Sequence, residues 1–247
     1  MLGLAGLTGA LGYISAHGDN LQYVIQDFYA NFSTTLFGTA IVILVVDQLN
    51  AARATALERA RLVREMGSSD RATATRAARE LDELGLLSSG YLDGADFSLA
   101  DLTSANLDRL RAMRCRMQGV KLNGASLAAC NLTESVLNFS DLRRSNLECA
   151  VLKDASLLEC DLEDADLGGS TLAGAQLTGT NLEGTDLRGA DLTDVDLTGA
   201  RMASALLTGA QLGGASINLG CPLPANVPTP LDVGNGRTEW PKGTVCA

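Results

Sequence analysis

A large apolar residue returns every five residues through the middle of the chain, and this period restricts the fold more than any other feature. The series runs from Leu92 to Ile217 without an insertion, and most of its members are leucine. Five is neither the period of about 3.6 residues of an α-helix nor the simple alternation of a flat strand. A leucine-rich helical region would need a spacing of about 3.5 or 3.6 residues, so the pattern argues against helix here.

Each five-residue unit has the same internal order. A small residue lies two positions before the large one, and a polar residue lies between them, as in Ala165-Asp166-Leu167. A small residue that points inward, a polar residue that points outward and a large residue that points inward give the alternation of a three-residue strand. The two remaining residues must turn a corner, and the second is often glycine, as at Gly169, because glycine accepts unusual backbone angles. A chain that turns after every unit closes on itself and stacks as a solenoid.

Residues 160–192 show the pattern most plainly, with units such as Cys-Asp-Leu-Glu-Asp, Ala-Asp-Leu-Gly-Gly and Thr-Asn-Leu-Glu-Gly. The pattern resembles the pentapeptide-repeat family over about half of the chain. This resemblance implies an all-β solenoid, a right-handed quadrilateral β-helix with four pentapeptides in each coil. We expect the β-helix over residues 89–219, preceded by an α-helical N-terminal membrane and cap region.

Four units per coil would place residues twenty apart side by side on the outside of the solenoid. Asp166 should therefore lie beside Asp186, and a single outward row should contain Asp101, Lys121, Asp141, Asp161, Asn181 and Arg201. One unit departs from the pattern, with Leu110 in the small slot and Ala112 in the large slot. We predict a locally irregular coil there, with its packing restored by the exchange of sizes. A kink that binds a partner is the alternative.

Residues 1–49 form a hydrophobic N-terminal region. Asp27 and Asp47 enclose an uncharged stretch, 28–46, whose second half is strongly apolar. About 20 residues cross a bilayer, so this stretch predicts a transmembrane helix. A helix buried against the solenoid is the alternative. Residues 1–16 are apolar and glycine-rich, and either a partial membrane helix or a flexible tail would fit them, which gives a hairpin or a single pass.

The arginines predict the orientation of this anchor. No Lys or Arg precedes Arg53, whereas Arg59, Arg61 and Arg64 follow the apolar stretch. Positive charge collects on the cytoplasmic side of a membrane helix, so the solenoid should face the cytoplasm at the cell membrane. A solvated helix face is the alternative for these arginines. The order of membrane segment, short helices and repeats is also similar to a membrane-anchored bacterial arrangement within the family.

Residues 50–88 are predicted to form a helical linker and an N-terminal cap for the solenoid. A helix over 71–84 should begin after Ser69 or Asp70 and stop at Gly85. Its apolar side should contain Ala74, Ala77, Leu81 and Leu84. The end of a β-helix exposes apolar groups and needs such a cover.

The Pro-rich segment 220–247 is predicted to be a C-terminal tail that covers the far end, and a free tail is the alternative. Cys221 and Cys246 flank this segment and could pair, although a reducing cytoplasm predicts free thiols. The other cysteines should take the small inward slot or an exposed corner: Cys115, Cys130 and Cys160 inside, Cys149 outside.

No catalytic arrangement is found in the sequence. His17, the only histidine, lies in the N-terminal region, so no Ser/His or Cys/His pair can form on the solenoid. There is no CxxC or Cys/His metal pattern and no phosphate-binding glycine loop in a strand-turn-helix setting. The many carboxylate pairs are explained by the repeat. We therefore expect no enzyme, no cofactor, no metal and no small-molecule substrate.

Charge is distributed unevenly along the repeats. The net charge of −10 argues against direct nucleic-acid binding, which needs a basic surface. Between 108 and 121 there are five basic residues and one acidic residue, whereas 154–200 contains eleven acidic residues and one arginine. The candidate interaction residues are basic at one end and acidic at the other: Arg109, Arg111, Arg114 and Arg116, then Asp161, Asp166, Asp186, Asp191 and Asp196.

These features favour a non-enzymatic, membrane-tethered protein that presents a rigid surface to a protein partner. Some members of the family resemble duplex DNA in shape and charge and act on DNA gyrase, so a DNA mimic that binds a type II topoisomerase is one alternative. A structural membrane-surface protein that self-associates as a homo-oligomer is another. The basic end could contact anionic lipid headgroups, or it could be a solvated face. The aspartates could equally serve only to keep the repeat soluble.

Overall fold

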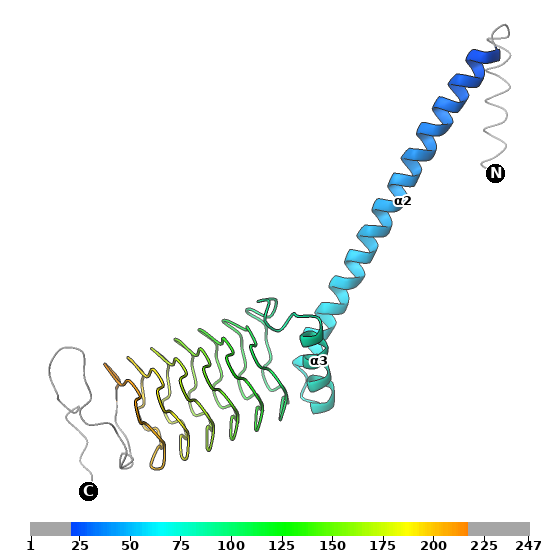
Figure 1. Cartoon of the computed structure of the whole chain (residues 1–247). Helices are drawn as coiled ribbons and strands as arrows, with labels where there is room; N and C mark the ends of the chain where they lie inside the picture. The colour runs from blue at the N-terminus through cyan, green and yellow to red at the C-terminus, as the bar shows by residue number, and fades with distance from the viewer. Residues whose placement is uncertain (1–20, 217–247) are drawn as a thin grey trace. The chain divides into compact units, whose positions relative to one another are not determined.

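The computed structural model describes residues 21–216 of the chain (Figure 1). Helix α2 (Leu21–Met66) is followed by helix α3 (Arg71–Glu83) and then by a stack of coils. The chain divides into two compact units, Met1–Glu58 and Arg59–Ala247. The predictions for residues 1–16 and 220–247, including a pairing of Cys221 with Cys246, lie outside the described residues.

Helix α2 contains the apolar stretch that the sequence singles out. It runs for 46 residues without a break, so the segment after the apolar stretch continues the same helix. The part from Thr39 to Met66 includes a stretch that is long and apolar enough to cross a membrane. Its side chains are exposed rather than buried, with Ile41 62% and Leu44 61% accessible.

Helix α3 begins where the sequence predicts, because Asp70 caps it. The Asp70 carboxylate accepts the amide hydrogen of Thr73 at 2.9 Å. Gly85 follows the helix with φ at 66°, a left-handed angle that suits glycine. The expected position of Leu84 is wrong, because this side chain is 56% exposed. The helix ends at Glu83 and Leu84 forms the C-cap, so the buried side of the helix stops before it.

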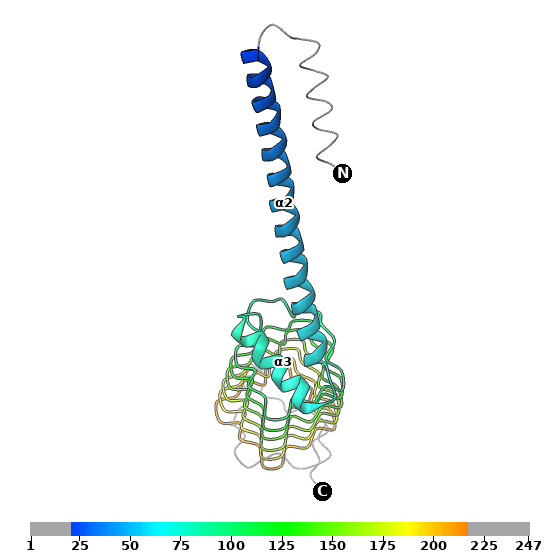
Figure 2. The ribbon, with the colours of Figure 1, turned by 90° about the vertical axis from the view of Figure 1, so that its right-hand side faces the viewer.

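The end of α2 and the buried side of α3 cover the first coil. Leu62, Met66 and Leu81 are buried, and the alanines of α3 let the helix approach closely. Figure 2 shows α3 lying across the end of the coil stack. Backbone groups at this end are also paired, since Asp101 N–H donates to Ser68 O at 2.9 Å and Arg111 N–H donates to Leu87 O at 2.8 Å. The first coil therefore does not end in an open edge.

The coils stack in a fixed register of twenty residues. Parallel bridges join Asp96 to Arg116, and the series continues unbroken to the bridge between Asp196 and Ser216. Four five-residue units therefore make one coil, and the coils lie side by side as Figure 1 shows. Only the outward residue of each unit forms a bridge, instead of the expected strand of three residues. The reason is that the turn begins directly after the large apolar residue.

The interior contains the large and the small residues of every unit. Leu102, Leu142 and Leu192 are fully buried, as the period predicts. Several polar residues in the small slot donate to carbonyl groups of the preceding coil: Ser135 Oγ donates to Ala112 O at 2.9 Å, and Thr180 Oγ1 donates to Leu157 O at 2.8 Å. Ser145 and Ser170 donate instead to carbonyl groups three residues earlier. The cysteine predictions are confirmed: Cys115, Cys130 and Cys160 are buried and Cys149 is exposed.

The second corner residue of most units has a left-handed backbone, whether or not it is glycine. Gly169 has φ at 64°, and Arg109 and Arg114 have 59° and 56°. The predicted irregular coil is therefore wrong, because these corners and the bridge from Arg111 to Asn131 are ordinary. Leu110 and Ala112 are both fully buried, so exchanging their sizes keeps the packed volume and the backbone has no need to move.

Candidate interaction surfaces of the solenoid

The bridges sort the outward residues into four rows, and each row defines one face of the solenoid. Consecutive units of a coil contribute to consecutive faces. Face 1 contains Arg111, Asn131, Val151, Thr171, Asp191 and Gln211. Face 2 contains Asp96, Arg116, Val136, Ser156, Gln176 and Asp196. Face 3 contains Asp101, Lys121, Asp141, Asp161, Asn181 and Arg201, which is the row predicted from the sequence. Face 4 contains Asn106, Ser126, Asn146, Asp166, Asp186 and Leu206.

The five candidate acidic residues do not form one surface. Asp166 and Asp186 are direct neighbours on face 4, as predicted. Asp161 lies on face 3, Asp191 on face 1 and Asp196 on face 2. Aspartates that follow one another in the sequence therefore point in different directions around the solenoid.

The four candidate arginines lie close together at the capped end. Arg111 lies in the middle of face 1, and Arg109 and Arg114 occupy the corners on its two sides. Arg116 lies on face 2, beyond the corner of Arg114. Two of the four have acidic neighbours: Arg111 lies 3.1 Å from Asp93, and Arg116 lies 3.8 Å from Asp96. The result is a basic band across face 1 and the adjoining part of face 2.

The outward aspartates have a structural role besides their charge. In each case the aspartate Oδ1 accepts the amide hydrogen of the residue two positions later in the chain. That residue is the first of the two corner residues. Gly168 N–H donates to Asp166 at 2.9 Å, and Arg188 N–H donates to Asp186 at 3.0 Å. Asp161, Asp191 and Asp196 accept the corresponding amides of Glu163, Thr193 and Thr198. A short side chain with an acceptor at this position forms a turn of the Asx type.

Sequence reasoning missed this role, although a signal for it exists. The outward position holds aspartate or asparagine many times, for example at Asn146 and Asp166, but never glutamate. Solubility alone would allow glutamate as readily as aspartate. The preference therefore reflects the length of the side chain and the position of its acceptor, in addition to charge.

In three units that lack Asp or Asn at the outward position, those of Met113, Ala128 and Leu158, the preceding coil supplies the acceptor. The amide of Met113 donates to Asp93 Oδ1 at 3.0 Å, and the amide of Ala128 donates to Asp108 Oδ1 at 3.1 Å. In both cases the acceptor comes from the first corner position one coil earlier. In these units the first corner amide is thus bound by an acceptor from the preceding coil, and in the units with outward Asp it is bound by an acceptor of the same unit.

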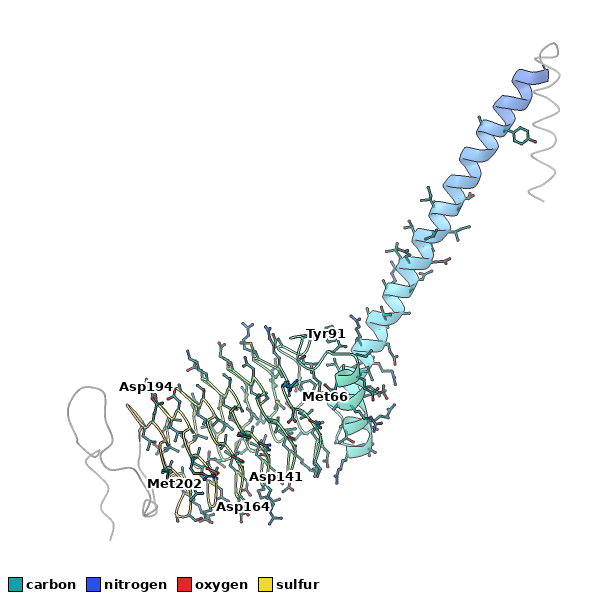
Figure 3. The ribbon with its side chains drawn as sticks, in the orientation of Figure 1. Met66, Tyr91, Asp141, Asp164, Asp194 and Met202 are labelled. Carbon is teal, nitrogen blue, oxygen red and sulfur yellow. The ribbon has the colours of Figure 1, made fainter. Side chains whose placement is uncertain are left out.

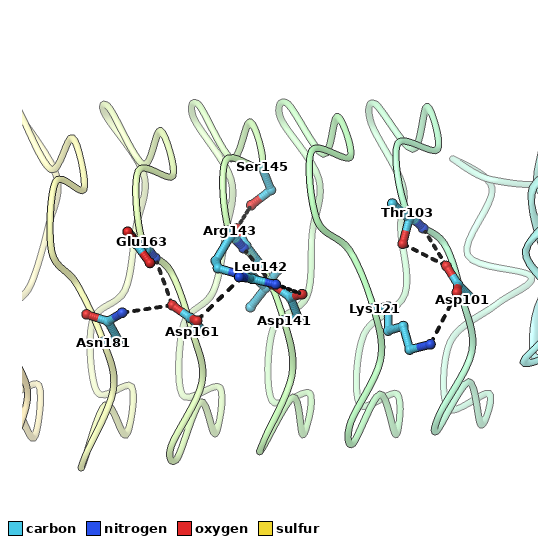
Figure 4. Close-up of polar contacts among 10 residues, drawn as sticks. All are labelled: Asp101, Thr103, Lys121, Asp141, Leu142, Arg143, Ser145, Asp161, Glu163 and Asn181. Atoms are coloured by element: carbon cyan, nitrogen blue, oxygen red, sulfur yellow. Dashed lines mark hydrogen bonds and ion pairs between the residues drawn. The ribbon is translucent and has the colours of Figure 1, made fainter.

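Face 3 contains a ladder of alternating charges (Figure 4). Arg143 lies 2.7 Å from Asp141 and 3.6 Å from Asp161, and so joins two coils. Lys121 lies 3.4 Å from Asp101 in the same row. The hydrogen bond from Arg143 lowers the pKa of Asp141 below its ordinary value. These pairs are exposed and each is worth at most about 1 kcal/mol, but together they neutralise much of the acidic charge of this face.

Face 4 contains a shallow depression of about 340 Å³, lined by Glu148, Cys149, Asp166, Gly168, Gly169, Asp186 and Arg188. The two glycines leave room there because they have no side chains. Asp186 is held by Arg188, whose hydrogen bond lowers the pKa of this carboxyl. Within residues 21–216, no group of three or more His, Cys, Asp or Glu side chains could hold a metal ion.

Among solved structures, the chain is similar to the pentapeptide repeat protein Rfr23 from the cyanobacterium Cyanothece 51142, with 26% identity over 45% of this chain and 66% of that one, and a TM-score of 0.24. A pentapeptide repeat protein of the Arabidopsis thaliana thylakoid lumen is 32% identical over 42% of this chain and 66% of that one, with a TM-score of 0.19. The chain thus spans just under two thirds of the length of these two proteins.

QnrB1, a plasmid-mediated fluoroquinolone resistance protein, is 20% identical over 50% of this chain and 70% of that one, with a TM-score of 0.22. The comparison with curated proteins finds no match. The family model for pentapeptide repeats matches in eight copies, over residues 86–119, 113–148, 145–184 and 185–218. These matches cover more than half of the sequence, coincide with the coil stack and agree with the expectation from the repeat pattern. The chain therefore belongs to the pentapeptide-repeat family.

Proposed function

We propose that this protein is a non-enzymatic, membrane-anchored member of the family whose solenoid presents a rigid surface to a protein partner. We further propose that the solenoid lies on the cytoplasmic side of the cell membrane. The observation that carries the anchor is the exposed apolar run of helix α2. The observation that carries the interaction role is a closed, fully packed solenoid whose chemistry lies on its outer faces.

The apolar run of α2 supports the anchor because its exposed side chains are consecutive. Ile41, Val42, Ile43 and Leu44 follow one another, so they point to all sides of the helix, and all four are exposed. A surface helix of a soluble protein has a polar face, and this stretch has none. Each such side chain gains about 1.5–3 kcal/mol on leaving water, which a bilayer would supply.

The arginines after the apolar run support the orientation. Arg53 is the first basic residue of the sequence, and several more follow it in the helix. A short segment rich in arginine next to a membrane helix stays on the cytoplasmic side in most membrane proteins. The solenoid follows these arginines in the chain and would lie on the same side.

The solenoid supports an interaction role because its core leaves no room for a buried ligand. Leucine fills the large slot in coil after coil, and within residues 21–216 no buried side-chain nitrogen or oxygen lacks a partner. The polar groups that remain available are on the faces and corners. A surface of this kind suits recognition of another macromolecule better than it suits chemistry on a small substrate.

The topoisomerase alternative has less support. A DNA mimic needs acidic groups that follow one continuous surface, whereas Asp161, Asp191 and Asp196 lie on three different faces. Face 3, which has the most acidic residues, also contains Lys121, Arg143 and Arg201. The similarity to QnrB1 is too remote to favour that function.

Fractionation of bacterial cells that express the full chain tests the anchor. The protein is expected to remain in membranes washed with alkaline carbonate. Replacing Ile43→Arg and Val45→Arg together should release it, because each arginine costs about 2.5–3.5 kcal/mol at the centre of a membrane helix. The matched control is Thr55→Arg with Leu57→Arg, in the same helix beyond the apolar run, and it should stay bound. Release of the parent protein by carbonate would reject the anchor.

The exposed thiol of Cys149 tests the orientation. In a chain with Cys221→Ser and Cys246→Ser, a membrane-impermeant maleimide is expected to label the protein only after the cells are permeabilised. The buried thiols of Cys115, Cys130 and Cys160 should stay unlabelled in both conditions. Labelling in intact cells would place the solenoid outside and overturn the cytoplasmic assignment.

A further inference from the structure

Face 1 and its corner toward face 2 contain opposite charges at their two ends. At the capped end lie Arg111, Arg114 and Arg116, and near the other end lie Asp191, Asp194 and Asp196. Figure 3 labels Asp194 near the far end of the coil stack. Arg114 is exposed and, within residues 21–216, has no ion-pair partner. None of the three aspartates lies within ion-pair distance of a described basic side chain. Asp194 is exposed, whereas Asp191 and Asp196 are half-buried and accept the amides of Thr193 and Thr198. Arg114 and Asp194 are therefore available to a second molecule, whereas Arg111 and Arg116 would share their charge with Asp93 and Asp96.

Each of the three arginines is separated from one of the three aspartates by the same number of residues. Arg111 and Asp191, Arg114 and Asp194, and Arg116 and Asp196 are each separated by 80 residues, or four coils of twenty. The two residues of each pair therefore lie in the same row, and they occupy the same position within their units. At the usual distance between neighbouring strands, the two members are about 19 Å apart.

We propose that this surface binds a second copy of the chain, in an antiparallel dimer with a two-fold axis level with Val151. Such an axis turns one solenoid end over end and keeps each row opposite itself. Arg111 of one copy then lies opposite Asp191 of the other, and Arg114 lies opposite Asp194. Because the contact is isologous, each of these pairs occurs twice.

The midpoints of the three pairs agree with a single axis. They fall at Val151, Asp154 and Ser156, which belong to the same coil. The outward residues on either side of Val151 in the row are uncharged, Asn131 and Thr171. Lys153 and Asp154 lie beside the axis, opposite the same residues of the other copy, so two lysines and two aspartates meet there and their charges balance. The centre of the surface thus contains a half-buried apolar residue with matched charges around it.

The other arrangements fit less well. A parallel dimer, with its two-fold axis along the solenoid, would place Arg111 against Arg111 and would bring Arg114 against Arg109 of the other copy. On face 3 the same antiparallel operation would bring Lys121 against Arg201, which are also 80 residues apart. Like charges at such positions oppose association. The charge pattern therefore selects face 1, and it selects the antiparallel direction.

This dimer rests on the interaction role proposed above and names its partner, but it does not depend on the membrane anchor. An anchor would nevertheless favour it, because two tethered copies share a thin layer of solution and their effective concentration rises. The carbonate wash tests the anchor by itself. The experiments below use the purified full chain in detergent and report only on the contact between solenoids.

Cysteine cross-linking tests the direction of packing. In a background of Cys149→Ser, Cys221→Ser and Cys246→Ser, one preparation contains Arg114→Cys and a second contains Asp194→Cys. Under mild oxidation the mixture is expected to form a disulfide-linked dimer, and neither preparation alone should do so. Cross-linking of Arg114→Cys with itself, or no cross-linking in the mixture, would overturn the antiparallel dimer.

Charge reversal tests the ion pairs. Arg114→Asp and Asp194→Arg should each weaken association at least about tenfold, because each places like charges opposite one another. The double variant restores opposite charges and should regain the parent affinity, which also shows that the solenoid still folds. All three corners have similar left-handed φ values, 56° at Arg114, 57° at Asp194 and 59° at Arg109. Association is measured by sedimentation velocity at two salt concentrations, and higher salt should weaken it.

Arg109→Asp is the matched control. Arg109 is exposed in the same coil and the same type of corner, but the residue four coils away is Gly189. Its reversal should leave the association constant within about twofold of the parent, since no charge faces it. An equal loss of affinity for Arg109→Asp and Arg114→Asp would show that net charge alone causes the effect. That outcome would reject the specific ion pairs. A chain that stays monomeric at every concentration would reject the dimer itself.

Discussion

Asn138 Oδ1 accepts the amide hydrogen of Leu158 at 3.1 Å, across one full coil of the solenoid. In many units the equivalent amide is bound within its own unit, as Gly168 is bound by Asp166. The unit of Leu158 has Ser156 at the outward position, and its hydroxyl also donates to Asn138, at 2.7 Å. The amide of the first corner residue is thus bound either by an acceptor of its own unit or by an acceptor of the preceding coil.

This exchange of acceptors can be tested with a double-mutant cycle. Asn138→Ala should lower the free energy of unfolding by about 1–2 kcal/mol, because the Leu158 amide loses this acceptor and the Ser156 hydroxyl keeps only its longer bond to Gln176. Adding Ser156→Asn supplies an acceptor within the unit and should recover most of this loss. Urea unfolding of the full chain, followed by circular dichroism, measures the four members of the cycle. A double variant as unstable as Asn138→Ala would contradict the exchange.

Asp166 separates the structural role of an outward aspartate from its charge. Asp166→Ala removes the acceptor for the Gly168 amide and should lower the free energy of unfolding by about 1 kcal/mol. Asp166→Asn keeps an oxygen at the same position and removes only the charge, so it should stay within about 0.5 kcal/mol of the parent. Thermal unfolding of the three proteins in parallel gives the comparison. Equal losses for alanine and asparagine would show that charge, and not the turn, matters at this position.

The cysteines should differ sharply in reactivity. Burial raises the pKa of the Cys115 thiol to about 11 and that of Cys160 to about 12, so almost no thiolate forms there at neutral pH. Cys149 is exposed at a corner. With the two tail cysteines replaced by serine, iodoacetamide should modify one thiol per folded chain and four per chain in denaturant, counted by intact mass. Modification of Cys160 in the folded protein would show that the coils open locally.

Stability should depend on pH only at the acidic end of the scale. The pKa values of Asp141 and Asp186 are lowered from 3.8, first of all by hydrogen bonds from Arg143 and Arg188. A carboxyl with a lowered folded-state pKa stabilises the fold above its unfolded pKa, and this contribution disappears as the pH falls through the folded-state value. The melting temperature should therefore be level from about pH 8 to pH 5 and fall below about pH 4.

The variant Asp141→Asn checks the source of this dependence. It cannot lose a charge at low pH, so its melting temperature should fall less between about pH 5 and pH 3 than that of the parent. Lys121 pairs with a different aspartate, and Lys121→Met should leave the contribution of Asp141 unchanged. A loss of stability between pH 7 and pH 5 would point to groups other than these aspartates.

Much of the fold follows from the five-residue period because the same physical constraint recurs in every unit. The period assigns Leu142 to the interior and Asp141 to the surface, and twenty residues per coil places Asp166 beside Asp186. The cap helix follows from ordinary helix signals at Asp70 and Gly85. These features depend on local composition and spacing, which a sequence shows directly.

The features that the sequence did not reveal depend on angles and on contacts between coils. The exchange of sizes at Leu110 and Ala112 was predicted, but only the packed coil shows that the backbone stays regular there. Arginine at a left-handed corner, as at Arg114, contradicts its ordinary preference and is tolerated because the neighbouring coils hold the backbone. The hydrogen bond from Leu158 to Asn138 joins residues twenty apart, so no local motif contains it.

The register of twenty residues also restricts how a solenoid of this kind can change its length. Inserting or deleting one pentapeptide would turn every later unit by a quarter turn, so that Asp191 would move from the side of Arg111 to the adjoining side. Only the gain or loss of four units at once keeps the later side chains on their original sides. Growth in whole coils would lengthen the molecule and leave its surface chemistry aligned, whereas growth by single units would rearrange every pattern beyond the insertion.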